Sequence, residues 1–130
     1  MILGDRYEAF ILAYCATILK VPIMHLHGGE LSYGSYDESF RHSITKMSYW
    51  HFVATKNSMQ RVSQMGEERN RIFYIGSLVN DNLKVTKKYN KEFLSKDLKF
   101  NLKKKLALLT YHPTTLISSS DDKIIKNIIK

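Results

Sequence analysis

The feature that most constrains the fold is an alternation of short apolar runs with longer stretches of helical periodicity in the first 83 residues. The runs have strand length, and three of the four stop at glycine, whereas the longer stretches repeat apolar residues three and four apart. Strands that alternate with helices form a parallel sheet with helices on both faces, so we expect an α/β fold. The predicted strands are residues 2–3, 22–27, 50–54 and 71–75, and the predicted helices are residues 6–20, 38–48 and 55–66.

The starts and ends of these helices carry local signals. Asp5, with Glu8 three residues later, resembles a capping box for the first helix, and Asp37 is placed to cap the second. Thr55 is placed to cap the third helix, which we expect to end at Gly66. The stretch 6–20 is apolar on nearly every side, which predicts a buried helix.

The alternation of strands and helices becomes irregular after residue 76, and both ends of the chain look truncated. A lysine-rich stretch leads to a predicted strand at 106–110, a serine-rich turn and a helix from about 122 to 130. The first strand has two residues and the last helix has no capping signal. We therefore expect a fragment of a two-domain α/β protein, with residues 1–79 closing the first domain and residues 80–130 opening the second.

Composition narrows the class of protein. The chain has 130 residues, of which 44% are hydrophobic and 25% charged, as in an ordinary folded domain. No apolar run reaches the ~18 residues of a membrane-spanning helix, and the amino terminus lacks the features of a signal peptide. Cys15 is the only cysteine, which excludes an internal disulfide and a cysteine-rich zinc site. We expect a soluble, cytoplasmic protein that does not bind membranes.

The net charge of +8 is concentrated in one segment. Residues 84–106 contain nine lysines against two acidic residues, whereas residues 1–83 contain equal numbers of basic and acidic residues. The segment has no arginine, and its aromatic residues are Tyr89, Phe93 and Phe100. Nucleic-acid sites favour arginine at base edges and aromatic rings for stacking. We therefore expect a solvated surface helix and linker and no nucleic-acid partner.

Polar residues gather where the predicted strands end. The clusters are residues 4–6 (GDR), 25–30 (HLHGGE), 37–42 (DESFRH) and 112–115 (HPTT). Ligands of parallel sheets bind beyond the carboxyl ends of the strands, and helix amino termini attract anions. Acidic groups beside arginine and histidine suit a phosphorylated sugar or a nucleotide.

Most of these residues also have a purely structural interpretation. Spacing alone favours Asp5 and Asp37 as helix caps. Gly28 and Gly29 either form a tight turn or let the backbone approach a ligand. Arg41 and His42 also fit the surface of an amphipathic helix, and residues 111–113 also fit the end of a strand.

A metal site is a separate alternative. His25 and His27 lie two apart on a predicted strand, where they share a face, and Glu30 follows closely. The remaining ligands of such a site are not visible at convincing spacing. A hydrogen-bonded core histidine is therefore the favoured interpretation, and we expect no metal.

Five segments in this order resemble one family. They are residues 3–8 (LGDRYE), 25–30 (HLHGGE), 37–48 (DESFRHSITKMS), 75–77 (IGS) and 112–115 (HPTT). The combination is similar to the hydrolysing UDP-N-acetylglucosamine 2-epimerases of bacterial sialic-acid synthesis. The resemblance runs from the first residue to about Thr115.

The resemblance implies a two-domain GT-B fold with the active site between two Rossmann-like domains. The domain switch would fall near residues 77–82. The family's amino-terminal glycine/arginine loop and its later Gly-Asn-Ser-Ser segment are missing here, so we expect these 130 residues to be inactive alone. Relatives imply a homo-oligomer at full length.

The implied reaction eliminates UDP from UDP-N-acetylglucosamine and then adds water to the 2-acetamidoglucal, which gives N-acetylmannosamine. It needs no cofactor and no metal, and its partner is a UDP-sugar substrate. Matched by position, Asp5 and Asp37 are catalytic carboxylates, and Glu30 is the favoured third group. His27 stands where many relatives carry a catalytic glutamate, so His27 is the alternative for proton transfer. The implied substrate-binding residues are Arg6, His27, Gly28, Gly29, Arg41, His42 and His112.

Three alternatives stay open at this point. The sugar could be a 2,4-diacetamido-trideoxy sugar on the route to legionaminic-type acids. The chain could be an inactive nucleotide-sugar-binding remnant. A metal-dependent hydrolase built on His25 and His27 is the third.

Overall fold

The computed structural model describes residues 1–102, 105–112, 115–116 and 125–128. Its sheet contains β1 (Ile2–Leu3), β2 (Met24–Leu26), β3 (Trp50–Val53) and β4 (Ile72–Tyr74), all parallel and in sequential order. The helices between them are α1 (Tyr7–Ile18), α2 (Asp37–Met47) and α3 (Lys56–Gln64), and a short 3-10 turn (Arg69–Arg71) precedes β4. The α/β fold with a parallel sheet is confirmed.

The helices between strands cover one face of this sheet, not two. The register aligns Ile2, His25, His51 and Ile72 across neighbouring strands, so these side chains share the face toward α1–α3. Crossovers of one hand between sequential parallel strands place every crossover helix on the same face. The prediction of helices on both faces is therefore wrong for the part of the chain that the structure describes.

Two apolar clusters join the helices to the sheet. Ala13, Ile23 and Ile44 form the first, between α1, α2 and the start of β2, and Phe10 packs against it. The second contains Val53, Val62 and Ile72, between β3, α3 and β4. A fully buried branched side chain of this kind contributes about 1.5–3 kcal/mol to folding.

Helix α1 is not the buried helix that its composition predicts. Ala13 is its only buried residue, whereas Leu12 and Ile18 are each 64% exposed. One side of α1 packs against α2 and β1, whereas the apolar residues on its other sides are exposed. The apolar stretch therefore predicts the helix correctly, but it overestimates how much of the helix is buried.

The predicted caps are partly right. Thr55 caps α3 by accepting a hydrogen bond from the Ser58 amide at 3.0 Å, as expected. Asp5 does not cap α1, whose N-cap residue is Arg6, and the Arg6 side chain makes no capping hydrogen bond. Asp37 is the first residue of α2 and not its cap. Both carboxylates have side-chain partners of their own, described below, which is why neither serves the helix backbone.

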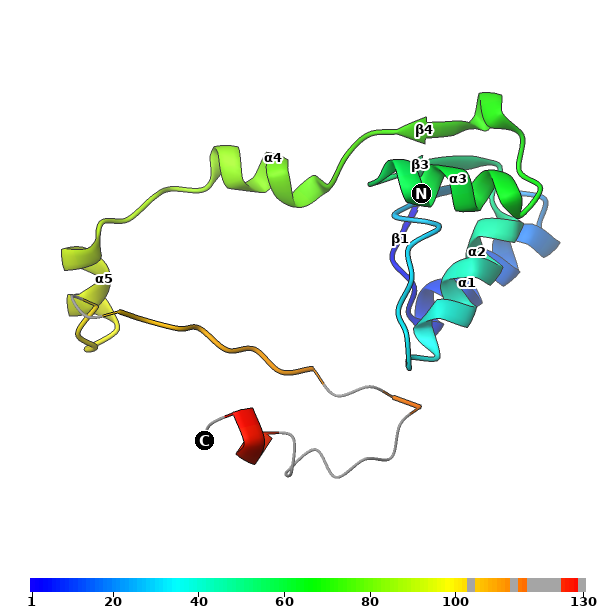
Figure 1. The fold of residues 1–130 in the computed structure, drawn as a ribbon. Helices are drawn as coiled ribbons and strands as arrows, with labels where there is room; N and C mark the ends of the chain where they lie inside the picture. The colour runs from blue at the N-terminus through cyan, green and yellow to red at the C-terminus, as the bar shows by residue number, and fades with distance from the viewer. Residues whose placement is uncertain (103–104, 113–114, 117–124, 129–130) are drawn as a thin grey trace.

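The chain beyond β4 leaves the sheet. Figure 1 shows α4 (Leu78–Val85) and α5 (Lys91–Asp97) away from the body formed by the sheet and α1–α3. Residues 105–112 form no strand, so the strand predicted at 106–110 is wrong. A strand needs a hydrogen-bonded neighbour, and no described strand lies beside this segment.

Two further predictions concern this part of the chain. Most of the helix predicted at 122–130 lies outside the described residues, although residues 125–128 are helical. The division at 79/80 falls within α4 and stays a prediction.

Candidate active site

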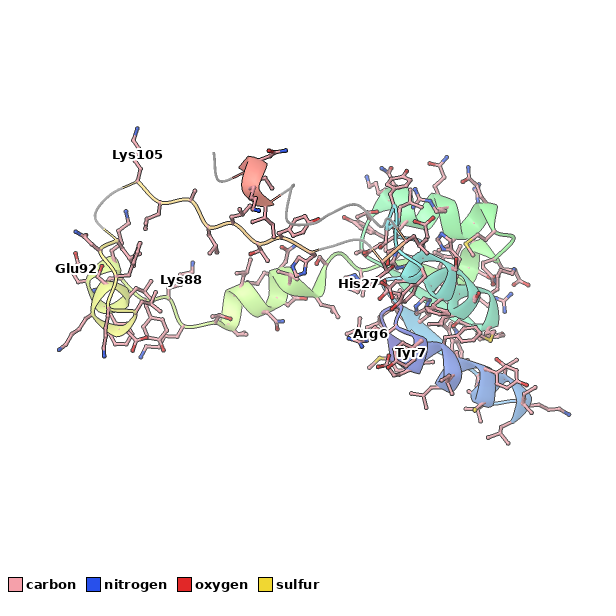
Figure 2. The ribbon with its side chains drawn as sticks, turned by 90° about the horizontal axis from the view of Figure 1, so that it is seen from below. Arg6, Tyr7, His27, Lys88, Glu92 and Lys105 are labelled. Carbon is pink, nitrogen blue, oxygen red and sulfur yellow. The ribbon has the colours of Figure 1, made fainter. Side chains whose placement is uncertain are left out.

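The polar clusters converge because the four strands are parallel. Their carboxyl ends meet at one edge of the sheet, which is where sequence reasoning expects a ligand. A hollow of about 560 Å³ lies there. Figure 2 labels His27 close to where the chain leaves for α4, and Arg6 and Tyr7 at the start of α1. The hollow is lined by His27, Glu30, Leu31, Ala54, Thr55, Asn57, Ser58, Arg61, Ser77 and Val79.

His27 and Glu30 form a pair on the wall of this hollow. The imidazole Nδ1 lies 2.8 Å from Glu30 Oε1. A carboxylate can only accept, so Nδ1 carries a hydrogen, and Nε2 is an acceptor when that is the only hydrogen on the ring nitrogens. The pair therefore has the composition of a general base oriented by a carboxylate.

The backbone at His27 is strained. Its φ is +62°, in the left-handed region that residues with a side chain seldom adopt. The His27 amide still donates to the Phe52 carbonyl at 2.8 Å, which extends the ladder between β2 and β3. Strained residues of this kind cluster at functional sites, where the surrounding structure holds them.

The two glycines let this turn pack closely. A Cβ on Gly28 would lie 2.9 Å from His25 Nδ1, and a Cβ on Gly29 would lie 2.6 Å from the Ser58 carbonyl oxygen. Gly29 also has φ +77°. Of the two interpretations of the glycines, the structure supports a tight turn packed on α2 and α3.

Asp5 forms an ion pair with Arg41. The guanidinium, on α2, is only 6% exposed and donates to Asp5 Oδ2 at the end of β1. It also donates to the Glu30 carbonyl and to Ser32 Oγ, both at 2.9 Å. Arg41 thus ties the end of β1 to the turn after β2. All three bonds go to the protein itself.

Asp37 lies at the start of α2 beside Ser35. The Ser35 hydroxyl donates to Asp37 Oδ2 at 2.5 Å, and the Asp37 amide donates to Ser35 Oγ at 3.2 Å. Thr115 Oγ1 lies 3.3 Å from Ser35 Oγ and accepts from the Tyr36 amide at 3.1 Å. The end of the HPTT cluster therefore contacts the loop that presents Asp37.

His25 lies under the site and is fully buried. Its Nε2 bonds the Gly4 carbonyl at 3.0 Å, and its Nδ1 lies 3.2 Å from Thr45 Oγ1. Burial lowers the pKa of His25 to about 4, although the bond to the Gly4 carbonyl opposes this shift. The ring is therefore neutral and anchors the turn before Asp5.

The metal interpretation has no support in this geometry. Both nitrogens of His25 have protein partners, and His27 lies beyond the end of β2 with a different backbone direction. In the part of the chain that the structure describes, no group of three or more His, Cys, Asp or Glu side chains could hold a metal ion.

Most of the predicted site residues lie outside this hollow, and Asp5 lines a different one. Arg6 is exposed and bonds Glu8 at 3.2 Å. His42 lines a different hollow, with Phe10 and Lys46, and burial lowers the pKa of its imidazole. His112 is exposed. Their contacts with a substrate stay predictions.

Sequence reasoning missed eight of the ten residues that line the hollow. The polar ones among them come soon after β3 or β4 or lie on α3, and are Thr55, Asn57, Ser58, Arg61 and Ser77. The rule that ligands bind beyond the carboxyl ends of parallel strands would have identified Thr55 and Ser77. Arg61 comes later, in the body of α3, and only the packing of α3 brings it to the site.

The fold and this edge define a parallel α/β protein whose carboxylates and histidine side chains gather at the strand ends. The sequence profile described as UDP-N-acetylglucosamine 2-epimerase matches residues 1–130. The chain belongs to this family.

Curated relatives match a large share of the chain. One from Campylobacter jejuni, named GDP/UDP-N,N'-diacetylbacillosamine 2-epimerase (hydrolyzing), is 45% identical over the whole chain and 34% of its own length. A polysialic acid biosynthesis protein P7 from Escherichia coli is 43% identical over 92% of the chain and 30% of its own length. A Legionella pneumophila UDP-N,N'-diacetylbacillosamine 2-epimerase (hydrolyzing) is 42% identical over 87% of the chain and 30% of its length. The chain thus spans about a third of these relatives.

Solved structures give the same fold. The co-structure of Staphylococcus aureus MnaA with UDP has a TM-score of 0.63 at 26% identity, over 73% of this chain and 27% of that one. Neisseria meningitidis UDP-GlcNAc 2-epimerase bound to UDP-GlcNAc has a TM-score of 0.59 at 21% identity, over 75% of this chain and 28% of that one. The described part of the chain is therefore a partial GT-B-type fold. None of its described helices is long and apolar enough to span a membrane.

Proposed function

We propose that these residues form part of the active site of a hydrolysing UDP-sugar 2-epimerase, which converts UDP-N-acetylglucosamine and water to N-acetylmannosamine and UDP. Membership of the family supports the reaction class. The observation that carries the proposal is the His27–Glu30 pair on the wall of the hollow.

The proposed reaction has two steps. UDP leaves from C1 while a base removes the proton from C2, which gives the 2-acetamidoglucal. Water then adds at C1, and a proton returns to C2 on the opposite face. Both steps need a base and an acid beside the sugar ring, because each moves one proton at or near C2.

His27 and Glu30 serve as one proton-transfer unit in this proposal. Glu30 accepts from Nδ1 and so leaves Nε2 of His27 to take or return a proton. This assignment explains how a histidine can replace the glutamate found in many relatives. It also gives Glu30 an orienting role instead of a separate catalytic one.

Asp5 and Asp37 supply the other carboxylates. Arg41 holds Asp5 at the end of β1, and Ser35 holds Asp37 at the start of α2. Both residues therefore have a fixed orientation at the same edge of the sheet. Arg6 and His112 are proposed to meet the UDP part of the substrate.

The names of two relatives support a second candidate substrate. The two relatives named as diacetylbacillosamine 2-epimerases are 45% and 42% identical and cover 100% and 87% of the chain. A UDP-N-acetylglucosamine 2-epimerase of Neisseria meningitidis serogroup B is 47% identical, but over 59% of the chain. The substrate could therefore carry a second acetamido group at C4.

An assay with both nucleotides tests the proposal. The product of the complete reading frame that contains these residues is incubated separately with UDP-N-acetylglucosamine and UDP-N,N'-diacetylbacillosamine, and released UDP is measured. We expect one substrate to give UDP and a free C2-inverted sugar, with kcat/KM at least tenfold above the other. Release of UDP from neither would contradict the proposal. A homo-oligomer and a cytoplasmic location remain predictions for that complete protein.

A further inference from the structure

Arg61 reaches the site from α3 without belonging to any of the polar clusters. It lies in the last turn of the helix, lines the hollow and donates through Nη1 to the Gly29 carbonyl. The sequence alone assigns no role to Arg61. Its contact is to the backbone of the turn that carries His27 and Glu30.

This turn is held from two sides by guanidinium groups. Arg61 on α3 donates to the carbonyl of Gly29, and Arg41 on α2 donates to the carbonyl of Glu30. Two consecutive peptide groups are therefore fixed by charged donors, which make stronger hydrogen bonds than neutral ones. Arg41 also serves Asp5, whereas the bond of Arg61 is directed to the turn alone in the described structure.

The turn needs such support because of its backbone. His27 has φ +62° and Gly29 has φ +77°, within three residues of one another. Gly29 also packs directly on α3, since a Cβ there would lie 2.7 Å from Val62 Cγ2. Conformations of this kind persist only where neighbouring contacts hold them. Arg61 is the polar contact that α3 provides.

We propose that Arg61 is a positioning residue, which holds the 27–30 turn so that Glu30 keeps the His27 imidazole directed into the hollow. The expected loss of rate rests on the proposed function, whereas the expected change in the position of the turn does not. Arg61 acts through the turn, so its loss changes the geometry of the proton-transfer pair and leaves substrate binding nearly intact.

The test compares Arg61→Met and Arg61→Lys in the complete protein. Met keeps the length of the side chain without a donor, and Lys restores one charged donor. We expect kcat to fall at least tenfold in Arg61→Met, with KM within threefold of the parent, and to recover partly in Arg61→Lys. Arg69→Met is the matched control, because Arg69 lies in the turn before β4, away from this hollow, and should leave kcat unchanged.

Other kinetic results would overturn the inference. A rise in KM with unchanged kcat would make Arg61 a substrate-binding residue. A lower melting temperature with unchanged kcat in the folded protein would make it only structural.

A spectroscopic readout separates this inference from the proposed function. The 15N resonance of His27 Nδ1 reports its bond to Glu30 in the protein without substrate. We expect it to move in Arg61→Met and to return toward the parent position in Arg61→Lys. An unmoved resonance would contradict the positioning role. The measurement decides this even if the parent protein releases no UDP, which would overturn the proposed reaction alone.

Discussion

Three buried polar side chains, His25, Arg41 and Thr45, connect the strand ends beneath the hollow. The Thr45 hydroxyl lies within hydrogen-bond distance of both His25 Nδ1 and the Arg41 carbonyl, at 3.2 and 3.0 Å. The hydroxyl has one hydrogen, so it donates to one of these two acceptors at a time. Buried polar groups are costly unless they are bonded, so this network favours the arrangement of the core that keeps its members bonded. Asp5 and the 27–30 turn are attached to this network through Gly4 and Arg41.

The neutral state of His25 makes the fold sensitive to acid. The pKa of His25 is about 4 in the fold, against 6.5 for an unperturbed ring, so the unfolded chain binds the additional proton between these values. The free energy of unfolding should be fully present above pH 6.5 and fall by about 3 kcal/mol as the pH drops to 4. Urea unfolding at pH 7, 5.5 and 4.5 measures this.

The control for this prediction is His25→Gln, whose amide can still donate to the Gly4 carbonyl but does not titrate. Burial also lowers the pKa of His42 and His51, which adds a pH dependence of the same sign to both proteins. The variant should therefore show a weaker dependence than the parent. An equal dependence in the two proteins would contradict the account of His25.

The two carboxylates proposed for catalysis give a second prediction at this scale. Asp5→Asn and Asp37→Asn should each lower kcat of the complete enzyme by orders of magnitude, whereas Asp81→Asn, an exposed residue of α4, should not. A loss below tenfold, about 1.4 kcal/mol, would mean that the residue is structural. Asp5→Asn also leaves the buried Arg41 without its partner, so its melting temperature must be measured beside its rate.

Helix α3 supports the site as an element. It begins with the Thr55 cap, packs Val62 into the core and lies directly against Gly29. Its position decides whether the 27–30 turn can form. The strand ends alone would not specify that turn.

Two glycine substitutions test this contact. Gly29 and Gly76 both have left-handed backbones, with φ +77° and +79°, but only Gly29 faces another element within 4 Å. Gly76→Ala should cost about 1–2 kcal/mol of unfolding free energy from its backbone alone. Gly29→Ala should cost more, because its Cβ would meet Ser58 and Val62. Equal costs in denaturant unfolding would show that α3 does not press on the turn.

The elements themselves were largely predictable from the sequence. Apolar runs ending at glycine or at a capping threonine located all four strands and the three helices between them, because those signals are local. The cap at Asp5 was wrong because a distant arginine competes for the carboxylate, and local spacing does not reveal distant partners. The strand at 106–110 was wrong because strand formation depends on a neighbour that the apolar run itself does not supply.

At the scale of the whole molecule, the site was predictable only in part. Parallel strands bring their carboxyl ends together, so the rule of strand ends correctly gathered Asp5, His27 and Glu30 at one edge. The roles of Arg41 and Arg61 depend on how two helices pack, which no spacing in the sequence shows. His42 follows Arg41 directly but lines the hollow beside Phe10 and Lys46, whereas Arg41 bonds the 27–30 turn, because neighbouring residues on a helix point in different directions.

The chain spans about a third of its curated relatives, so the proposed reaction has to be tested on the complete protein. The central claim is that this protein breaks the C2–H bond of a UDP sugar and releases the free sugar with C2 inverted. The most direct measurement is the reaction of the complete protein with UDP-N-acetylglucosamine in deuterium oxide, with residues 1–130 alone and Asp37→Asn as controls.

We predict released UDP and free N-acetylmannosamine that carries one deuterium at C2, and no turnover in either control. Free N-acetylglucosamine without deuterium, or a 2-epimerised sugar that is still attached to UDP, would contradict the account.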